Sequence, residues 1–440
     1  FRRFPHRVAP RVVYRGCAMT TIFLDHHSTT PPSEAVIDAV TRAMRIAGNA
    51  SSSHEGGKAA AKIVEDARRC VAETMGGVDP AGVIFFGSAT EASNLAIKGA
   101  VERWWMVRRC KPRIAFSAIE HSSIIAPAKR LAARGMCDID VIPVGPSGIV
   151  DVRDVANVLR QNTALVAVQT CNNECGNIQP TEQIAALCKR AGVIYLADAS
   201  QDFAKHDHDY SQCGMVVAAA HKISAPVGVA IGWLAPETFG RLEPQILGGT
   251  QQRDLRGGTL PVVMCAAVAA ACREMRESKR GPETIHGLSG EPLRLARLRD
   301  TLLARLRASI PDLRVNGAMD PSVLGARNGD TSAPRVRLHC NLNITLPLIC
   351  PVSLGAALAP HVSVSAAAAC KSLGGERSHV LEAIGAPNDG ADLRFGLGRC
   401  NTMEHVEFVS ALIARAANEL RGVGCEAPSE CEGGACPVRR

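Results

Sequence analysis

Between residues 36 and 275 the chain alternates between helical apolar spacing and short continuous apolar runs. In the helical stretches, such as 60–75, apolar residues recur three and four positions apart. The short runs are continuous rather than alternating, so we expect strands that are buried on both faces. These runs are 83–86, 114–116, 165–168, 193–197, 215–220 and 229–233. The pattern predicts an α/β fold with a mainly parallel sheet under helices.

A charged segment at 276–283, broken by Gly281 and Pro282, marks the expected end of this large domain. Beyond it, the pattern predicts an amphipathic helix at 293–307 and a closing helix at 405–421. We therefore expect a large domain, a smaller α+β domain and two unstructured ends. The predicted bounds are 36–275 for the large domain, 19–35 with 276–422 for the small one, 1–18 for a disordered basic extension and 423–440 for a flexible cysteine-containing tail.

Two chemically distinctive residues follow neighbouring apolar runs. Ligands collect at the carboxyl ends of parallel strands, so residues placed there are candidates for chemistry. Lys222 follows one run, and a desolvated amine has a lowered pKa and forms a Schiff base with a carbonyl. Asp198 ends the preceding run, and a carboxylate beside such a lysine suits pyridoxal phosphate, whose ring nitrogen it would keep protonated. The ordinary alternative is that Asp198 caps a helix and Lys222 is solvated.

Three more strand ends carry polar residues, and each has an ordinary alternative. The segment 87–91 opens a helix with small residues and a hydroxyl, as a phosphate site does, but it also fits a simple N-cap. His121 is placed to stack on a flat ring, or to be a core histidine. The segment 172–174 offers amide donors, or forms a turn. All three follow a predicted strand within a few residues, so together they favour one cofactor site at the strand ends.

The chain resembles the pyridoxal-phosphate cysteine desulfurases of the aminotransferase class V group, of fold type I, from about Ile22 to Leu420. Many segments match in the order that the family has them, so chance similarity is a poor explanation. The matching segments are LDHHSTTP (24–31), GNASSSH (48–54), SATE (88–91), EH (120–121), NNE (172–174), DASQ (198–201), HK (221–222), RGGTLP (256–261), SAAAAC (365–370) and RFGLGR (394–399).

The resemblance implies a role for each matching residue. Lys222 would hold the cofactor and move the substrate's α-proton, and Asp198 would pair with the ring nitrogen. Gln201 would bond the ring hydroxyl and His121 would stack on the ring. The remaining implied positions are Ala89, Thr90 and His221 for the phosphate, Thr259 for the phosphate of a neighbouring subunit in a homodimer, and Asn173 and Arg394 for the substrate carboxylate, with Asn173 also near the cofactor.

Among seventeen cysteines, the resemblance selects Cys370 as the nucleophile. A thiolate captures sulfur leaving the substrate's β-carbon and keeps it as a persulfide. Cys370 lies between the small residues 366–369 and the polar run 371–378, a composition that suits a mobile loop. The implied reaction converts L-cysteine to L-alanine, with sulfur passed to an acceptor protein such as an iron–sulfur scaffold.

Several positions depart from the family pattern. Ala219 stands where a phosphate-binding serine is usual, Gly214 where an aspartate is usual, and Gln252 where a glutamate is usual. Alanines also fill 366–368, where the family usually has serines and a glycine. Three alternatives therefore stay open: a selenocysteine lyase, a non-catalytic homologue that acts as a sulfur-pathway partner, and another class V activity such as transamination.

Composition narrows the remaining choices. The net charge of +8 includes five arginines in residues 1–18, a segment with no acidic residue, so the rest carries +3 and predicts no nucleic-acid binding. No apolar run reaches the ~18 residues of a membrane span, so we expect no membrane segment. Scattered cysteines indicate a reducing compartment, and with the arginine-rich extension they favour the cytoplasm or the mitochondrion.

Two short segments contain residue types that bind metal ions, but neither gives a strong indication of a metal site. The run 206–209 alternates histidine and aspartate, but it falls in a variable loop of the family. Cys425, Cys431 and Cys436 lack a fourth ligand and lie in a glycine-containing tail. We predict no metal site.

Overall fold

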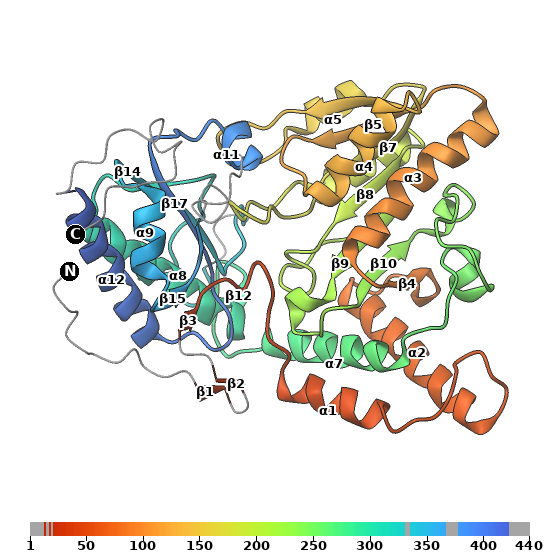
Figure 1. Ribbon diagram of the computed structural model, residues 1–440, viewed down its shortest axis with the longest axis horizontal. Helices are drawn as coiled ribbons and strands as arrows, with labels where there is room; N and C mark the ends of the chain where they lie inside the picture. The colour runs from red at the N-terminus through yellow and green to blue at the C-terminus, as the bar shows by residue number, and fades with distance from the viewer. Residues whose placement is uncertain (1–12, 15–16, 19–20, 331–334, 367–376, 422–440) are drawn as a thin grey trace. The chain divides into compact units, whose positions relative to one another are not determined.

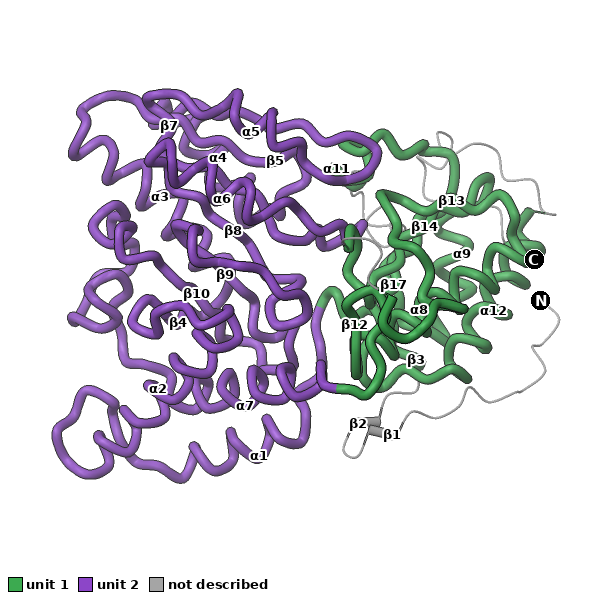
Figure 2. Tube along the Cα trace, turned by 180° about the vertical axis from the view of Figure 1, so that it is seen from behind, with its two compact units in different colours: residues 1–28, 281–440 green, residues 29–280 purple. Residues whose placement is uncertain are grey.

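The computed structural model describes residues 13–14, 17–18, 21–330, 335–366 and 377–421 (Figure 1). The chain divides into two compact units (Figure 2). Unit 1 comprises residues 1–28 and 281–440, and unit 2 comprises residues 29–280. Unit 2 begins seven residues before the predicted start of the large domain at 36 and ends five residues after its predicted end at 275.

Unit 2 contains a seven-stranded sheet in the order β4-β10-β9-β8-β7-β5-β6. Strands β5 to β9 run parallel, and β10 is antiparallel to both of its neighbours, so β4 points the same way as β9. The strands are β4 (Val83–Phe86), β5 (Arg113–Ser117), β6 (Asp138–Ile142), β7 (Thr163–Ala167), β8 (Ile194–Asp198), β9 (Met215–Ala219) and β10 (Ala230–Leu234). The α/β class with a mainly parallel sheet is confirmed.

Helices cover both faces of this sheet, which explains the continuous apolar runs. Successive residues of one strand enter different cores: Phe85 belongs to the core that includes residues of α2 and α7, while Phe86 belongs to the core that includes residues of α3 and α4. Only β6 escaped prediction, because it is an edge strand in which Asp138 and Asp140 interrupt the apolar residues. The helices of unit 2 are α1 (Glu34–Ala43), α2 (Glu55–Thr74), α3 (Ala89–Arg108), α4 (Ser122–Ala133), α5 (Val152–Val158), α6 (Thr181–Arg190) and α7 (Val262–Ser278).

Unit 1 is built on a four-stranded antiparallel sheet in the order β13-β14-β17-β16. The N-terminal β3 (Ile22–Phe23) joins this unit by pairing in parallel with β15 (Val362–Ser363). Both predicted helices are present, as α8 and α12. The other bounds are β13 (Arg314–Val315), β14 (Asn341–Pro347), β16 (Ser365–Ala366), β17 (Gly390–Gly396), β11 (Thr284–Ile285), β12 (Leu288–Ser289), α8 (Gly290–Ser309), α9 (Pro351–Leu358), α11 (His379–Ala383) and α12 (Met403–Arg421).

Some sequence predictions fall outside the described residues, among them the 423–440 tail and Cys370. Of the expected disordered extension, the four described residues form a short antiparallel pair, β1 (Val13–Tyr14) with β2 (Cys17–Ala18). Within the described ranges, no helix combines the length and the apolar character that crossing a bilayer requires.

Candidate active site

Five of the strands that end at one edge of the sheet in unit 2 lead to a predicted site residue, which lies at the end of the strand or in the segment after it. Because β4, β9, β8, β7 and β5 point in one direction, their carboxyl ends lie side by side (Figure 1). These ends lead to Ala89, Lys222, Asp198, Asn173 and His121, respectively. The topology therefore brings the five strand ends together, while the roles of the five residues stay a prediction.

Lys222 lies on a tight turn, η2 (Ala220–Ile223), directly after β9. Thr30 secures this turn: its Oγ1 donates to the carbonyl of His221 (2.7 Å) and accepts the N–H of Ser224 (2.7 Å). His221 Nδ1 lies 3.0 Å from the hydroxyl of Thr29. Burial first, and then the charge of Lys222, lower the pKa of His221, so its imidazole is neutral near pH 7.

Asp198 is the last residue of β8 and is only 6% exposed. Its Oδ1 accepts the N–H of Ser200 (2.9 Å), which shapes the turn that carries the buried Gln201. No helix begins here in the described chain, so the alternative that Asp198 caps a helix is wrong.

The segment that follows β4 has the features of an anion site. Ser88 is the N-cap of α3, and its Oγ accepts the N–H of Glu91 (3.1 Å). The N–H groups of Ala89 and Thr90, in the first turn, have no partner within the helix and so suit a phosphate. The Glu91 carboxylate accepts the N–H of Gly87 (2.8 Å) and pairs with Nε of Arg256 (2.8 Å). This ion pair joins the first turn of α3 to the loop that carries the exposed Thr259. The sequence alone did not predict this contact.

His121 is the N-cap of α4, and its ring is exposed. Its Nδ1 accepts the N–H of Ser123 (3.1 Å), which sets the orientation of the ring. The alternative of a core histidine is therefore wrong. The preceding Glu120 is fully buried, and burial raises its pKa to about 8 even though its Oε1 accepts hydrogen bonds from Ser117 Oγ (2.5 Å) and Gln169 N (2.8 Å).

The segment 172–174, which follows β7, was expected either to offer amide donors to a ligand or to form a turn. Asn172 is fully buried, and its Oδ1 accepts the N–H groups of Glu174 (2.8 Å) and Cys175 (2.9 Å), so it forms the turn. Its Nδ2 donates to Ile119 O (3.1 Å), which ties this turn to the loop before His121. Asn173 is partly exposed.

Arg394, the predicted ligand of the substrate carboxylate, lies on β17 of unit 1. Its Nη2 donates to Oδ1 of Asp25 (2.8 Å), and Ser28 Oγ donates to the other oxygen of that carboxylate (2.6 Å). Asp25 also forms an isolated backbone bridge with Gly396. The guanidinium of Arg394 is thus held by Asp25, a residue 369 positions away in the chain. Cys370 lies outside the described residues.

The departures from the family pattern have local consequences. Ala219 precedes the Lys222 turn and makes no side-chain cap bond. At Gly214, a Cβ would lie 3.1 Å from Ile194 Cγ2, so a larger residue would have to displace β8. The amide of Gln252 accepts the N–H of Phe85 (2.6 Å) and donates to its carbonyl (2.6 Å), a pairing that a glutamate could not make in full.

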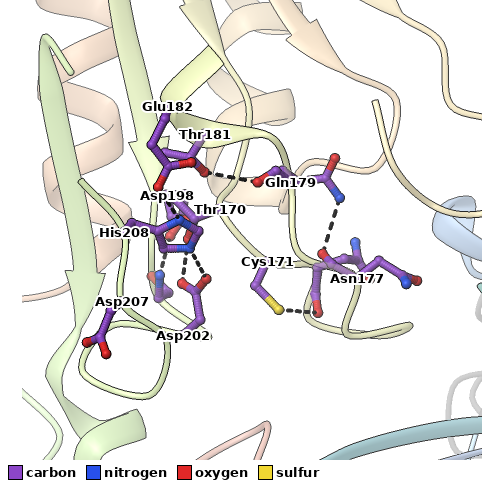
Figure 3. Close-up of polar contacts among 12 residues, drawn as sticks. Thr170, Cys171, Asn177, Gln179, Thr181, Glu182, Asp198, Asp202, Asp207 and His208 are labelled. Atoms are coloured by element: carbon purple, nitrogen blue, oxygen red, sulfur yellow. Dashed lines mark hydrogen bonds and ion pairs between the residues drawn. The ribbon is translucent and has the colours of Figure 1, made fainter. Parts of the chain in front are cut away.

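The run 206–209 does not form a metal site in the described structure. His208 is buried between two carboxylates, with Nε2 at 2.7 Å from Asp202 Oδ2 and Nδ1 at 3.4 Å from Glu182 Oε1 (Figure 3). Burial lowers the pKa of His208, but the two carboxylates together outweigh it and raise the value to about 9. The residue is therefore a buried imidazolium near pH 7.

Comparisons with known proteins point to one family. The model of the family described as "Aminotransferase class-V" matches residues 22–318. A "Cysteine desulfurase" of Frankia sp. (strain EuIK1) is 33% identical, and the alignment covers 93% of this chain and 94% of the relative. A "Cysteine desulfurase, mitochondrial" of Arabidopsis thaliana is 31% identical, with 91% and 83% covered. A solved structure titled "NIFS-LIKE PROTEIN" is 25% identical with a TM-score of 0.75, covering 91% of this chain and 100% of its own.

Proposed function

The chain belongs to the aminotransferase class V family, and because its relatives over most of its length are cysteine desulfurases, we propose that it is a pyridoxal-phosphate enzyme that converts L-cysteine to L-alanine. One observation supports this most directly: Lys222 and the buried Asp198 follow adjacent parallel strands at the sheet edge where ligands bind.

The described residues fit the cofactor. When bound, pyridoxal phosphate supplies an electron-poor ring that withdraws electrons from the substrate's carbon atoms. Lys222 would hold the aldehyde carbon, and the Asp198 carboxylate would keep the ring nitrogen protonated. The N–H groups of Ala89 and Thr90, with the neutral imidazole of His221, would bind the phosphate. His121 would stack on the cofactor ring, and Gln201 would bond the ring hydroxyl.

The substrate carboxylate is bound by Arg394 and Asn173. A planar guanidinium matches a carboxylate with two parallel hydrogen bonds. Asp25 accepts a bond from Nη2 of Arg394, which limits the rotation of the guanidinium before substrate arrives. Lys222 then moves the α-proton. The Cys370 thiolate attacks the substrate sulfur: a sulfur–sulfur bond forms, the carbon–sulfur bond breaks with its electrons left on carbon, and protonation of that carbon gives alanine.

The proposed reaction implies two protein partners, a second subunit of the same chain and a sulfur acceptor. Thr259 lies exposed on the loop after η4 (Gln251–Asp254), where it is available to the phosphate of a second subunit in a homodimer. The persulfide on Cys370 passes its sulfur to an acceptor protein such as an iron–sulfur scaffold. A mitochondrial relative supports the mitochondrion as one compartment, with the cytoplasm as the other.

The deciding experiment measures alanine and persulfide from the purified full chain with pyridoxal phosphate and either L-cysteine or L-selenocysteine. Alanine should form from L-cysteine, and Lys222→Ala should abolish it. Cys370→Ala should abolish the persulfide yet keep the cofactor's visible absorbance, whereas Cys110→Ala, at an exposed cysteine, should change neither. Alanine from selenocysteine alone would reassign the enzyme as a selenocysteine lyase. Cofactor binding without turnover would identify a non-catalytic homologue, and ketoacid production a transaminase.

A further inference from the structure

Unit 1 holds a cysteine–histidine pair that the desulfurase reaction does not use. Cys400 lies in the turn after β17, partly exposed, and its Sγ is 3.4 Å from Nε2 of His26. His26 is only 4% exposed, and the two residues are 374 positions apart in the chain. A thiol in contact with an imidazole has the arrangement of an activated nucleophile and its base.

The imidazole is held in place by its surroundings. The ring of His26 meets the ring of Phe23 edge to face, with centroids 4.8 Å apart at 84°. Its backbone N–H donates to the carbonyl of Gly396 (3.1 Å). At Gly398 an added Cβ would lie 2.5 Å from Cε1 of His26, so only glycine leaves room for the ring there. Nε2 therefore faces the thiol in a fixed orientation.

Hydrogen bonds also hold the turn that carries Cys400, and one of the side chains that make them is the cationic Arg294. Asn401 Oδ1 accepts the N–H of Gly398 (2.7 Å), and its Nδ2 donates to the carbonyl of Phe23 (2.9 Å). Arg294 donates to the carbonyls of Asn401 (2.6 Å) and Arg399 (3.2 Å) on either side of Cys400.

The charges around the thiol favour its ionised form. The pKa of Arg294 is raised, first by its hydrogen bonds with Glu291 and in smaller part by the Cys400 sulfur. The attraction between this guanidinium and a Cys400 thiolate is mutual. Of the described residues, His26 contacts Cys400, Arg294 bonds the backbone on both sides of it, Arg399 precedes it in the chain, and the acidic Glu291 pairs with Arg294. A thiol beside an imidazole and a guanidinium ionises more readily than a free cysteine.

Other cysteines in the described part of the chain lack this combination. Most are buried, and burial raises the pKa of Cys188 and Cys265 to about 12. Cys110 is exposed but has no described contact with an imidazole. Cys110 therefore serves as the matched control.

We propose that Cys400 and His26 form a second thiol site, which accepts sulfane sulfur from a persulfide. His26 takes the proton from Cys400, and the thiolate attacks the outer sulfur of the donor R–S–SH. One sulfur–sulfur bond forms at Cys400, the donor's sulfur–sulfur bond breaks, and the donor leaves as a thiolate that takes the proton from His26. No external oxidant or reductant takes part. The site requires neither Lys222 nor Cys370, so it stands apart from the function proposed above.

The experiment treats the full-length Cys370→Ser protein, in which no desulfurase persulfide forms, with glutathione persulfide and maps the modified cysteines by mass spectrometry. At about pH 6.5, Cys400 should gain a sulfur atom at least about tenfold faster than Cys110, because a pKa one unit lower means about ten times more thiolate. His26→Gln should reduce the rate at Cys400 to that of Cys110.

A second measurement needs no variant. The pH profile of iodoacetamide alkylation at Cys400 should reach its half-maximal rate about one pH unit or more below the ~8.5 of an ordinary thiol, while Cys110 should follow the ordinary profile. Equal profiles for the two cysteines would overturn the proposal. So would a fast-alkylating Cys400 that gains no sulfur, or a His26→Gln protein, folded by circular dichroism, in which Cys400 keeps its rate.

Discussion

One missing hydroxyl group distinguishes Ala219 from the serine that the family usually has before the proposed phosphate-binding turn. Ala219 ends β9 directly before the turn that carries His221 and Lys222, and it offers no hydroxyl. The first turn of α3 offers backbone N–H groups to the proposed phosphate site, and no side-chain substitution removes them. We therefore expect the missing hydroxyl to weaken the retention of pyridoxal phosphate without abolishing it.

Ala219→Ser should restore one hydrogen bond to a charged group. Such a bond contributes about 1.5 kcal/mol, which corresponds to roughly tenfold tighter binding of pyridoxal phosphate. Titration of the cofactor-free protein with pyridoxal phosphate, followed by fluorescence, measures the dissociation constant. Ala133→Ser, at the exposed end of α4, is the control and should leave it unchanged. An unaltered constant in Ala219→Ser would show that the turn does not face the phosphate.

At the scale of elements, a buried charge pair supports the turn after β8. Asp202 is fully buried three residues after Ala199; its carboxylate accepts the hydroxyl of Thr170 from the segment after β7 and contacts the imidazolium of His208 (Figure 3). Glu182, on α6, approaches the other nitrogen of His208. The charge on His208 thus joins a helix, a loop and the turn that carries Asp198 and Gln201.

This arrangement predicts a loss of stability on the alkaline side. The folded-state pKa of His208 is raised from 6.5 to about 9, so the imidazolium's contribution is complete below pH 6.5 and is lost as pH rises through about 9. The unfolding free energy should fall between these values by up to about 1.4 kcal/mol per pH unit. Urea unfolding across this range measures the slope. His208→Gln should remove the contribution of His208 to the slope of unfolding free energy against pH, and His361→Gln should leave the slope unchanged. A slope in His208→Gln equal to that of the wild type would refute the role given to the His208 imidazolium.

At the scale of the whole molecule, each unit has its own core, but unit 1 also buries a group of charges. Arg299 is fully buried, with guanidinium nitrogens 2.7 Å from Asp300 and 3.7 Å from Asp320. Asp320 Oδ2 also accepts a bond from Arg335 Nη2 (2.6 Å), and its Oδ1 accepts the N–H of Val336 (2.7 Å). One carboxylate therefore neutralises parts of two buried arginines.

Asp320→Ala should destabilise unit 1 strongly, because it leaves buried guanidinium charge without its partner. Breaking a buried pair in this way costs about 3–5 kcal/mol. Hydrogen exchange read by mass spectrometry should show lost protection in β14 and α8, while β7 to β9 of unit 2 stay protected. Asp312→Ala removes the exposed partner of Arg421 in the same unit and should have a much smaller effect. Full protection in Asp320→Ala would contradict the role given to this cluster.

Much of the fold was predictable because burial on both faces leaves a local mark. All six continuous apolar runs became strands. Five of them, all but the antiparallel β10, point the same way, so their carboxyl ends lie at one edge of the sheet. The edge strand β6 was not predictable, since Asp138 and Asp140, which pair with Arg113 of β5, interrupt its apolar residues. At the site, local spacing could not tell whether His121 is exposed or whether Asp198 caps a helix, because neighbouring segments decide both.

By itself, the sequence determined the alternation of helices and strands, the family to which the chain belongs, and the set of residues at the strand ends. These are local properties: apolar spacing and short motifs that depend on residues a few positions apart. Only the tertiary structure decided which side chains meet. It paired Glu91 with Arg256, enclosed His208 between Asp202 and Glu182, and brought Cys400 to His26. No local pattern records such contacts, because packing alone brings distant parts of the chain together.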